Sequence, residues 1–350
     1  MIKLSGYQEQ AQRLLGEFFR AKRRELQKNT PLLLPLFDRT MEYMMRPKSK
    51  RVRGYLVCAG YQLVSGKLPA EVVRLSIIAE MLHAYLLIED DIIDRDEQRR
   101  GGKTLHISLA HVHRRHPDAE HLGMSHAVLL AGLLGIWARQ RIHASAFPLA
   151  RKERVLRKVE SMLEETHYGE MLDVLLASGG RATERDIVLV YLLKTARYTF
   201  EAPLHIGAIL AGAPKNDLAA LSRFAIPVGI AFQMQDDLLG LFGTKRQIGK
   251  PVTSDLEEQK KTLPFLYARQ MLTPSQRKPF DRLLVQRPTR KSLAAVRRMV
   301  ESSGARFACA EAARQMVEEG KKALTDHPGF GIQEVSRLIQ LADFVVQRSY

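Results

Sequence analysis

Cysteine is scarce in this chain of 350 residues, and its first residues do not have the pattern of a secretion signal. Cys58 and Cys309 are too few for a disulfide framework and lack the spacing of metal ligands, so we expect buried free thiols in a reducing, cytoplasmic environment. Residues 1–8 lack the apolar core of a signal peptide. The composition therefore excludes a small disulfide-stapled protein and predicts no secretion signal.

Long hydrophobic runs are also missing. The longest stretch without a formal charge covers residues 122–138, and it contains three glycines together with Ser125 and His126. A bilayer requires about 20 predominantly apolar residues. We therefore predict a buried helix at the centre of a bundle rather than a membrane span.

Acidic residues are outnumbered by basic ones, with 38 Asp and Glu against 54 Lys and Arg and a formal net charge of +16. Such an excess is typical of proteins with polyanionic partners: nucleic acid, an anionic membrane or phosphorylated metabolites. Residues 139–158 and 277–298 carry much of the positive charge on amphipathic segments, and a solvated basic face is the favoured interpretation. No aromatic-interleaved basic ribbon supports nucleic-acid binding. Weak, salt-sensitive contact with an anionic membrane stays open.

Runs of alternating β-branched residues, repeats and linkers are missing too, which predicts one all-α domain over residues 1–350, a single large helical bundle with a central active-site cavity. Residues 7–45 are predicted to form one or two helices with a break near Pro31. Residues 99–104 are predicted to form a loop, and residues 111–121 a solvated connection. Further helices are predicted over residues 55–65, from about residue 70 into the acidic segment 89–97, and over 122–143, 149–178, 184–200, 202–212, 215–242, 263–272, 275–286, 290–302, 304–325 and 331–349.

Acidic residues are nevertheless concentrated in one segment, where residues 89–97 contain six of them. Asp90 and Asp94 share one face of the predicted helix, with Asp91 to the side. Like charges one turn apart repel and acids oppose the dipole at a helix C-terminus, so a positive group should compensate. Oxygen ligands alone suit Mg²⁺. A solvated acidic cap is the alternative for this cluster taken by itself.

A second acidic pair, Asp236 and Asp237, also ends a predicted helix, one turn after Gln233. Basic sites precede and follow it: Lys194-Thr195, Gly249-Lys250-Pro251 and Lys260-Lys261-Thr262. Each lysine alone would be a solvated side chain. Two acidic clusters alternating with basic sites instead predict a cavity for diphosphates and divalent metal.

These residues resemble the trans-isoprenyl diphosphate synthases, or polyprenyl synthetases, over nearly the whole chain. Asp90-Asp91-Ile92-Ile93-Asp94 followed by Arg99-Arg100-Gly101 is similar to the first Asp-rich motif of the family. Gln235-Asp236-Asp237 with Gly249-Lys250-Pro251 is similar to the second. The resemblance implies the isoprenoid synthase fold, a dimer, and Mg²⁺-dependent head-to-tail transfer of an allylic prenyl group to isopentenyl diphosphate.

The resemblance also implies roles for single residues. Three Mg²⁺ ions, expected with bound diphosphate, would be held by Asp90, Asp94 and Asp236, supported by Asp91 and Asp237. The allylic diphosphate would contact Arg99, Lys194, Lys250 and Lys260. Isopentenyl diphosphate would contact Lys50, Arg53, His83 and Arg100. The developing carbocation would face carbonyl groups of Lys194, Thr195 and Gln233. No Ser, Cys or His nucleophile is needed.

The chain departs from the family pattern at four places. Gly240 ends the second motif where many members carry Asp, and Leu133 stands where Asp is frequent. Gln259 precedes Lys260 where Gly is common. The basic turn reads Lys48-Ser49-Lys50-Arg51-Val52-Arg53-Gly54 where Gly-Gly-Lys-Arg-x-Arg-Pro is usual. The first two acids of the second motif remain, so we expect metal binding.

Product length is expected to depend on the residues one turn before Asp90. The pattern there is closest to archaeal-type geranylgeranyl diphosphate synthases, because Tyr85 is aromatic and nothing is inserted between Asp91 and Asp94. We expect Tyr85 to form the floor of the chain cavity, with Leu86 as the other candidate because it lies nearer the Asp90 face. The predicted product has twenty carbons. Alternatives are a farnesyl or longer-chain synthase, a weakly active or regulatory subunit, and, less favoured, a class I terpene cyclase.

Overall fold

The computed structural model describes residues 4–47, 49–179, 182–243 and 254–347. The chain divides into two compact units, which are described separately below. The first unit comprises Met1–Arg157 with Ile206–Gly212, and the second comprises Lys158–His205 with Ala213–Tyr350. The single domain predicted for residues 1–350 stays a prediction.

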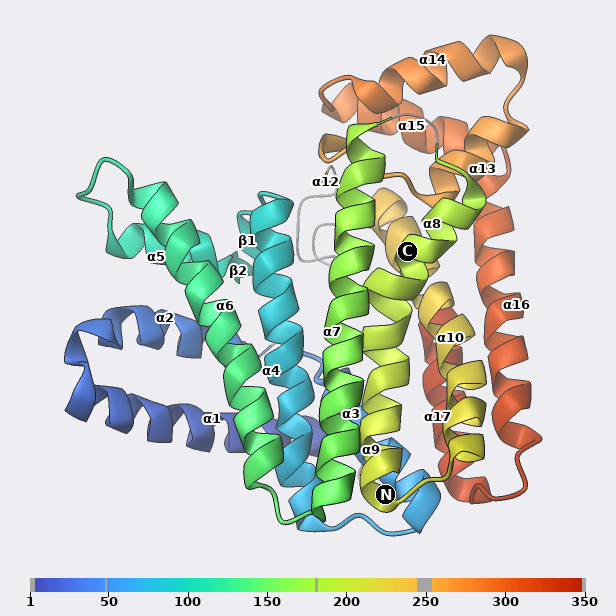
Figure 1. Cartoon of the computed structure of the whole chain (residues 1–350). Helices are drawn as coiled ribbons and strands as arrows, with labels where there is room; N and C mark the ends of the chain where they lie inside the picture. Colours follow the sequence, from blue (N-terminus) through green and yellow to red (C-terminus); the bar gives the residue numbers. More distant parts are fainter. Residues whose placement is uncertain (1–3, 48, 180–181, 244–253, 348–350) are drawn as a thin grey trace. The chain divides into compact units, whose positions relative to one another are not determined.

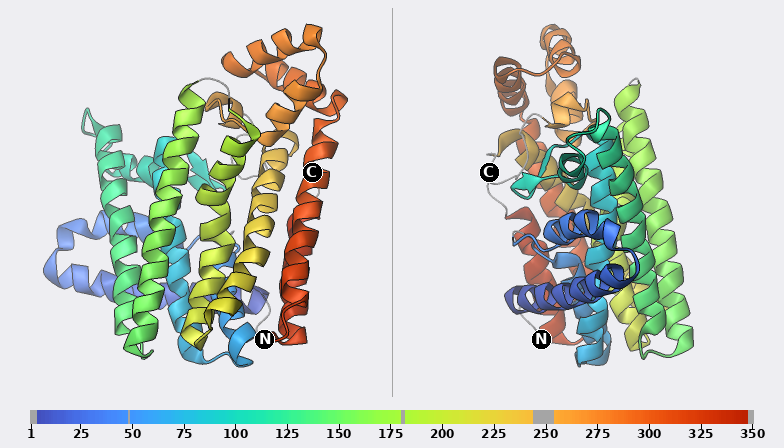
Figure 2. Two further views of the ribbon diagram at one scale, coloured as in Figure 1. Left: turned by 45° about the vertical axis from the view of Figure 1, so that its right-hand side comes forward. Right: turned by 90° about the vertical axis from the view of Figure 1, so that its left-hand side faces the viewer.

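The first unit is helical apart from one short hairpin (Figure 1). Its elements are α1 (Leu4–Asn29), the 3₁₀-helix η1 (Pro31–Leu33), α2 (Leu34–Met44), α3 (Val52–Ser65), α4 (Ala70–Ile93), β1 (Gln98–Arg99), β2 (Gly102–Lys103), α5 (Leu105–Val112) and α6 (Ala119–Ala144). α4 packs against α3, α5 and α6, and α1 lies beside α2 in both views of Figure 2. The acidic end of α4 therefore belongs to a helix that is packed against three others.

Two helices, α7 (Leu149–Ser178) and α9 (Ala202–Ala211), contribute residues to both units. The other elements of the second unit are α8 (Glu184–Val190), the π-helix η2 (Tyr191–Glu201), α10 (Lys215–Phe242), α12 (Ser254–Glu257), α13 (Leu263–Met271), α14 (Pro274–Val285), α15 (Arg290–Ser302), α16 (Ala305–Thr325) and α17 (Ile332–Val346). The predicted all-α class is confirmed, and α7 and α10 begin and end where the sequence placed them.

Glycines bring the neighbours of η2 close to it. A Cβ atom at Gly229 of α10 would lie 2.5 Å from the Cα of Ala196, and one at Gly169 of α7 would lie 2.4 Å from the backbone nitrogen of Lys194. Contacts this short leave no room for any side chain at either position. Both helices therefore pack directly against the π-helix segment that carries Lys194 and Thr195.

A segment predicted as loop contains regular structure, and a short helix follows it. Residues 99–104 hold part of an antiparallel hairpin in which Gln98 pairs with Lys103 and Arg99 with Gly102. The two-residue turn has positive φ at both Arg100 (54°) and Gly101 (77°), as a type I′ turn requires. α5 then occupies 105–112 and was not predicted, because eight residues give too short a pattern for helical periodicity.

The helix predicted to be buried, α6, is only partly so. Within the described part of the chain it is the one helix long and apolar enough to cross a membrane, and 44% of its most apolar stretch is buried. Large apolar side chains on one side are exposed. They are Met124 (37%), Val128 (51%), Leu129 (66%), Leu133 (37%) and Ile136 (47%). One side of α6 therefore packs against α4, and the other side exposes apolar side chains to solvent.

Candidate active site

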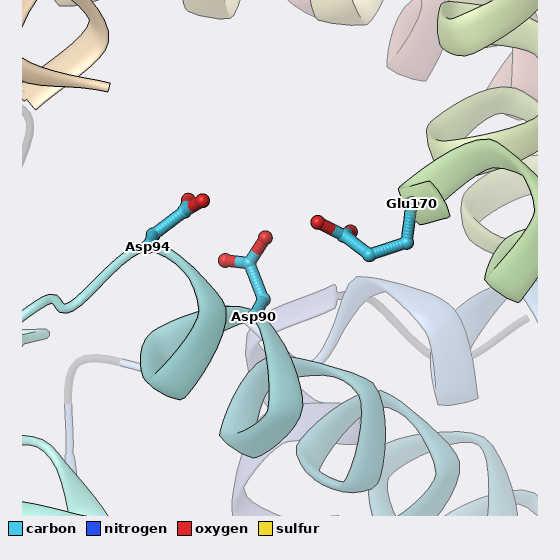
Figure 3. A group of neighbouring side chains, drawn as sticks. All are labelled: Asp90, Asp94 and Glu170. Carbon is cyan, nitrogen blue, oxygen red and sulfur yellow. The ribbon is translucent and has the colours of Figure 1, made fainter. Parts of the chain in front are cut away.

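The first acidic cluster lies where α4 ends. Asp94 is the C-cap residue of the helix, and its backbone N–H donates to the carbonyl oxygen of Asp90 at 2.8 Å. Carboxylate oxygens of these two half-buried side chains lie within 4.8 Å of each other. Figure 3 shows both side chains on the last turn of α4 and also labels Glu170 of α7. The two carboxylates therefore converge at the helix end.

Carboxylate oxygens are the only donors that Asp90 and Asp94 offer, and this is the ligand chemistry that Mg²⁺ prefers. Their partial exposure leaves room for water and substrate oxygens in the coordination shell. A divalent cation would also offset the repulsion between the two charges and their unfavourable position at the helix C-terminus. The residues present therefore fit Mg²⁺.

Asp91, between them in sequence, points inward and is fully buried. It accepts hydrogen bonds from the hydroxyl of Tyr43 at 3.2 Å and from Nε of Arg99. Burial raises the pKa of Asp91 to about 6, against the opposing effect of Arg99. Asp91 therefore belongs to the supporting structure of the cluster and not to its exposed face.

Arg99 is held by three carboxylates. Besides Asp91, its guanidinium donates to Asp90 at 2.8 Å and to Asp96 at 3.0 Å. Burial disfavours the charged form, but the three carboxylates together raise the pKa of Arg99 well above its usual value. Arg46 supports the hairpin by donating to the backbone carbonyls of Arg99 (2.9 Å) and Lys103. The predicted clamp residue is thus a fixed cation bound directly to the acidic cluster.

The basic residues predicted for isopentenyl diphosphate meet around His83. Arg100 donates to Oγ of Ser49 at 2.6 Å, and its Nη2 lies 2.9 Å from Nε2 of His83. Burial, followed by the positive charges of Arg53 and Arg100, lowers the pKa of His83 well below its usual value. The guanidinium groups near His83 therefore form a cluster of positive charge. Lys50, the fourth predicted residue, is exposed on the adjoining turn.

Arg51 was not predicted to matter, yet it anchors the basic turn. It adopts a left-handed backbone conformation (φ 53°), and its guanidinium lies 3.5 Å from Glu80 with both side chains almost completely buried. Glu80 also accepts the backbone N–H of Gly54 at 2.9 Å. The buried pair therefore fixes the segment between Lys50 and Arg53. No signal in the sequence separates this arginine from its basic neighbours.

In the second unit, Lys194 lies on η2 and pairs with two carboxylates of α7. Its Nζ is 3.0 Å from Glu170 and 2.8 Å from Asp173, and all three side chains are largely buried. Glu170 and Asp173 lie three residues apart on one helix face, which could have suggested a shared partner. Lys194 is therefore held in place before any substrate binds.

The second acidic pair is joined to η2 by a chain of buried and partly buried hydrogen bonds. Thr195 donates to Oε1 of Gln233 at 2.7 Å, and Nε2 of Gln233 donates to Asp237 at 2.8 Å. The hydroxyl of Tyr191 donates to the other oxygen of Asp237 and accepts the backbone N–H of Leu263 at 3.0 Å. The structure thus brings Thr195, Gln233 and Asp237 together, as predicted roles in one site require, and adds Tyr191.

The remaining predicted residues differ in burial and in their contacts. Asp236 is half-buried next to Asp237, and Lys260 pairs with Glu258 at 2.7 Å. Gln259 has a φ of 53°, which explains why glycine suits this position. Lys250 lies outside the described residues.

The two candidates for the chain-length floor lie on the same turn of α4. The ring of Tyr85 faces Gly135 of α6, where an added Cβ would be 3.8 Å away, and burial and then Glu89 raise the pKa of its hydroxyl to about 12. Leu86 is buried. The assignment of the floor to Tyr85 stays a prediction.

Fold and sequence together define the class of protein. Residues 34–301 match the sequence profile of the family described as polyprenyl synthetase. The chain belongs to this family, has its isoprenoid synthase fold, and is a prenyltransferase, a trans-prenyl diphosphate synthase. The predicted family and enzyme class are confirmed.

Particular relatives show how near the similarity is. A crystal structure of geranylgeranyl pyrophosphate synthase from Corynebacterium glutamicum, complexed with isoprenyl diphosphate and magnesium, has a TM-score of 0.93 at 26% identity and covers 99% of this chain and 100% of that one. Geranylfarnesyl diphosphate synthase of Aeropyrum pernix is 27% identical over 87% of this chain and 92% of its own length. A short chain isoprenyl diphosphate synthase of Methanocaldococcus jannaschii is 29% identical over 68% and 67%.

Proposed function

We propose that this prenyltransferase condenses isopentenyl diphosphate with an allylic diphosphate in a Mg²⁺-dependent reaction, with geranylgeranyl diphosphate as its main product. The observation that carries the proposal is the contact of His83 with Arg100, at 2.9 Å between Nε2 and Nη2, a few turns from the carboxylates of Asp90 and Asp94 on the same helix. A metal site beside a separate cluster of cations suits two diphosphate substrates, only one of which is bound through metal.

The proposed roles follow from the chemistry of each group. Mg²⁺, when bound, neutralises charge on the departing diphosphate. Its ligands are Asp90, Asp94 and Asp236. The cations assigned to the allylic diphosphate are Arg99, Lys194, Lys250 and Lys260, and those assigned to isopentenyl diphosphate are Lys50, Arg53, His83 and Arg100. Thr195 and Gln233 direct polar oxygens at the developing cation.

The contacts of Arg99 and Lys194 support these roles. Each is already fixed by two or more carboxylates, so neither has to be ordered when the substrate arrives. Preorganised charges stabilise a departing anion without the cost of reorganisation during the reaction. The four aspartates of the two acidic pairs and Asp94 are all present, which favours an active enzyme over a regulatory subunit.

The function is tested by incubating the protein with Mg²⁺, isopentenyl diphosphate and each allylic primer of five, ten or fifteen carbons, and then identifying the products by chain length. We expect turnover that depends on both substrates and on Mg²⁺, with twenty carbons dominant. Farnesyl diphosphate is the second candidate. Because the relative from Aeropyrum pernix is a geranylfarnesyl diphosphate synthase, the same assay should also measure a twenty-five-carbon product. Absence of condensation with every primer would refute the proposal.

Product length is assigned to Tyr85. Replacing its ring with a methyl group in Tyr85→Ala should lengthen the product to twenty-five carbons or more, because the bulky group beside Gly135 is removed. Leu86→Ala tests the other candidate on the same helical turn. Unchanged products in Tyr85→Ala together with longer products in Leu86→Ala would assign the floor to Leu86 instead.

We also propose that the enzyme is a homodimer in which a second copy covers the exposed side of α6. Five large apolar side chains on a single helix face form a surface that a monomer rarely leaves in water. Leu129→Glu, at the most exposed of them, should produce a monomer in analytical ultracentrifugation, whereas Gln140→Glu on the same helix should not. A wild-type monomer at micromolar concentration would contradict this assignment.

A further inference from the structure

Each acidic pair contains one aspartate that is turned into the protein. Asp91 is fully buried whereas the Asp90 side chain is 19% exposed, and Asp237 is buried whereas Asp236 is half-buried. Buried carboxylates require hydrogen-bond donors, since burying an unsatisfied charge is costly. The donors of these two aspartates have one feature in common.

A buried tyrosine hydroxyl donates to the inward aspartate in both units. Tyr43 of α2 donates to Asp91 at 3.2 Å, and Tyr191 of η2 donates to Asp237. Both tyrosines are almost completely buried. The two pairs come from different helices in separate units, so the same arrangement occurs twice in the chain without a sequence repeat.

We propose that Tyr43 and Tyr191 are positioning residues, each of which fixes the inward aspartate of an acidic pair and thereby the direction of its outward, metal-binding neighbour. The inference rests on the proposed function, because it assumes that Asp90 and Asp236 bind the metal. A carboxylate whose oxygens are already held cannot rotate toward the metal, so it keeps the adjoining backbone and side chain in a fixed orientation.

Tyr191 has a second connection that extends this role. Its hydroxyl accepts the N–H of Leu263, the first residue of α13, directly after the Lys260 segment. Through Asp237 it also sets Gln233, whose amide nitrogen donates to Asp237 while its oxygen accepts from Thr195. One hydroxyl therefore joins η2, α10 and the start of α13, the three parts of the proposed site in the second unit.

The variants Tyr43→Phe and Tyr191→Phe remove only the hydroxyl. Tyr267→Phe is the matched control, because the Tyr267 hydroxyl also donates to a carboxylate, that of Glu184 at 2.7 Å, without belonging to either acidic pair. Mg²⁺ binding is measured by calorimetry in the presence of inorganic diphosphate, which requires no turnover. We expect the Kd for Mg²⁺ to rise about fivefold in both variants and to change less than about twofold in the control.

Kinetics separate positioning from general destabilisation. Because both tyrosines are buried and their hydroxyls point to the inward aspartates, kcat should fall about tenfold while the KM for each substrate changes by less than about threefold. Wild-type values of kcat and of the Kd for Mg²⁺ in both variants would overturn the inference.

Two features of the experiment keep its outcomes distinct. Wild type and Tyr267→Phe report prenyl transfer itself, so failure of the proposed function appears there, while the calorimetry still reports on the tyrosines. If Tyr191→Phe does not fold, Asp237→Asn is the second variant. The amide oxygen of the new side chain can still accept from the Tyr191 hydroxyl, but its N–H₂ group then faces the N–H₂ group of Gln233 and cannot accept from it. We expect about a tenfold lower kcat for this variant. Full activity of Asp237→Asn would overturn the inference for the second unit.

Discussion

The buried pair between Arg51 and Glu80 allows a quantitative test of how the basic turn is held. Glu80→Gln keeps the shape of the side chain and removes its charge, which leaves the Arg51 guanidinium buried without its carboxylate; the two side chains are 3% and 2% exposed. Breaking a buried ion pair from one side costs about 3–5 kcal/mol. The amide oxygen still accepts the N–H of Gly54, so the loss concerns the charge.

The expected change in Tm follows from chain length. The entropy of unfolding is about 2.1 cal/mol/K per residue, or about 0.7 kcal/mol/K for this chain, so the substitution should lower Tm by about 4–7 °C. Glu71→Gln on the same helix is the control, because Glu71 pairs with Arg74 at the surface and such pairs contribute less than about 1 kcal/mol. Differential scanning fluorimetry measures both.

Glu80→Gln should also raise the KM for isopentenyl diphosphate, because the backbone between Lys50 and Arg53 loses its anchor. A Tm within about 2 °C of wild type, comparable with that of Glu71→Gln, would show that the Arg51 charge is stabilised by other groups. The reasoning about the basic turn would then be wrong.

Three further predictions concern other parts of the site. Asp90→Asn should lower kcat by about two orders of magnitude or more with little change in Tm, since Arg99 keeps Asp91 and Asp96; near-full turnover would remove Asp90 from the metal site. Lys50→Ala should raise mainly the KM for isopentenyl diphosphate, and an effect confined to the allylic KM would reverse our division of the cations. Gln259→Gly should be about 1 kcal/mol more stable than Gln259→Ala in urea unfolding, because only glycine adopts positive φ without strain; equal stability would contradict this.

The helical periodicity of apolar residues, together with glycines at the helix ends, was sufficient to predict the long helices. α10 ends at Phe242 before a glycine, and α7 is followed by a Gly-Gly pair, so both ends carried a local signal. The β1–β2 hairpin and α5 were missed because each depends on few residues and is stabilised by packing within the first unit. Length, rather than any special chemistry, separates the predicted elements from the missed ones.

The candidate site was predictable where charge is concentrated in sequence. Asp90 and Asp94 could be paired from helix geometry alone, and Asp236 and Asp237 from their position at a helix end. Partners far apart in sequence could not be found this way, as the contacts of Tyr43 with Asp91 and Tyr191 with Asp237 show. A tyrosine inside an apolar helix pattern gives no indication that its hydroxyl meets a carboxylate.

The π-helix from Tyr191 to Glu201 has a consequence for insertions and deletions. A π-turn accommodates about one residue more than an α-turn, so removing one residue here can restore an α-helix without shifting the register of its ends. The packing of α8 and α10 against this segment would then survive, while Lys194 and Thr195 would turn by about 100° relative to one flank. A one-residue deletion at this point is therefore compatible with the fold but changes the direction of the Lys194 side chain.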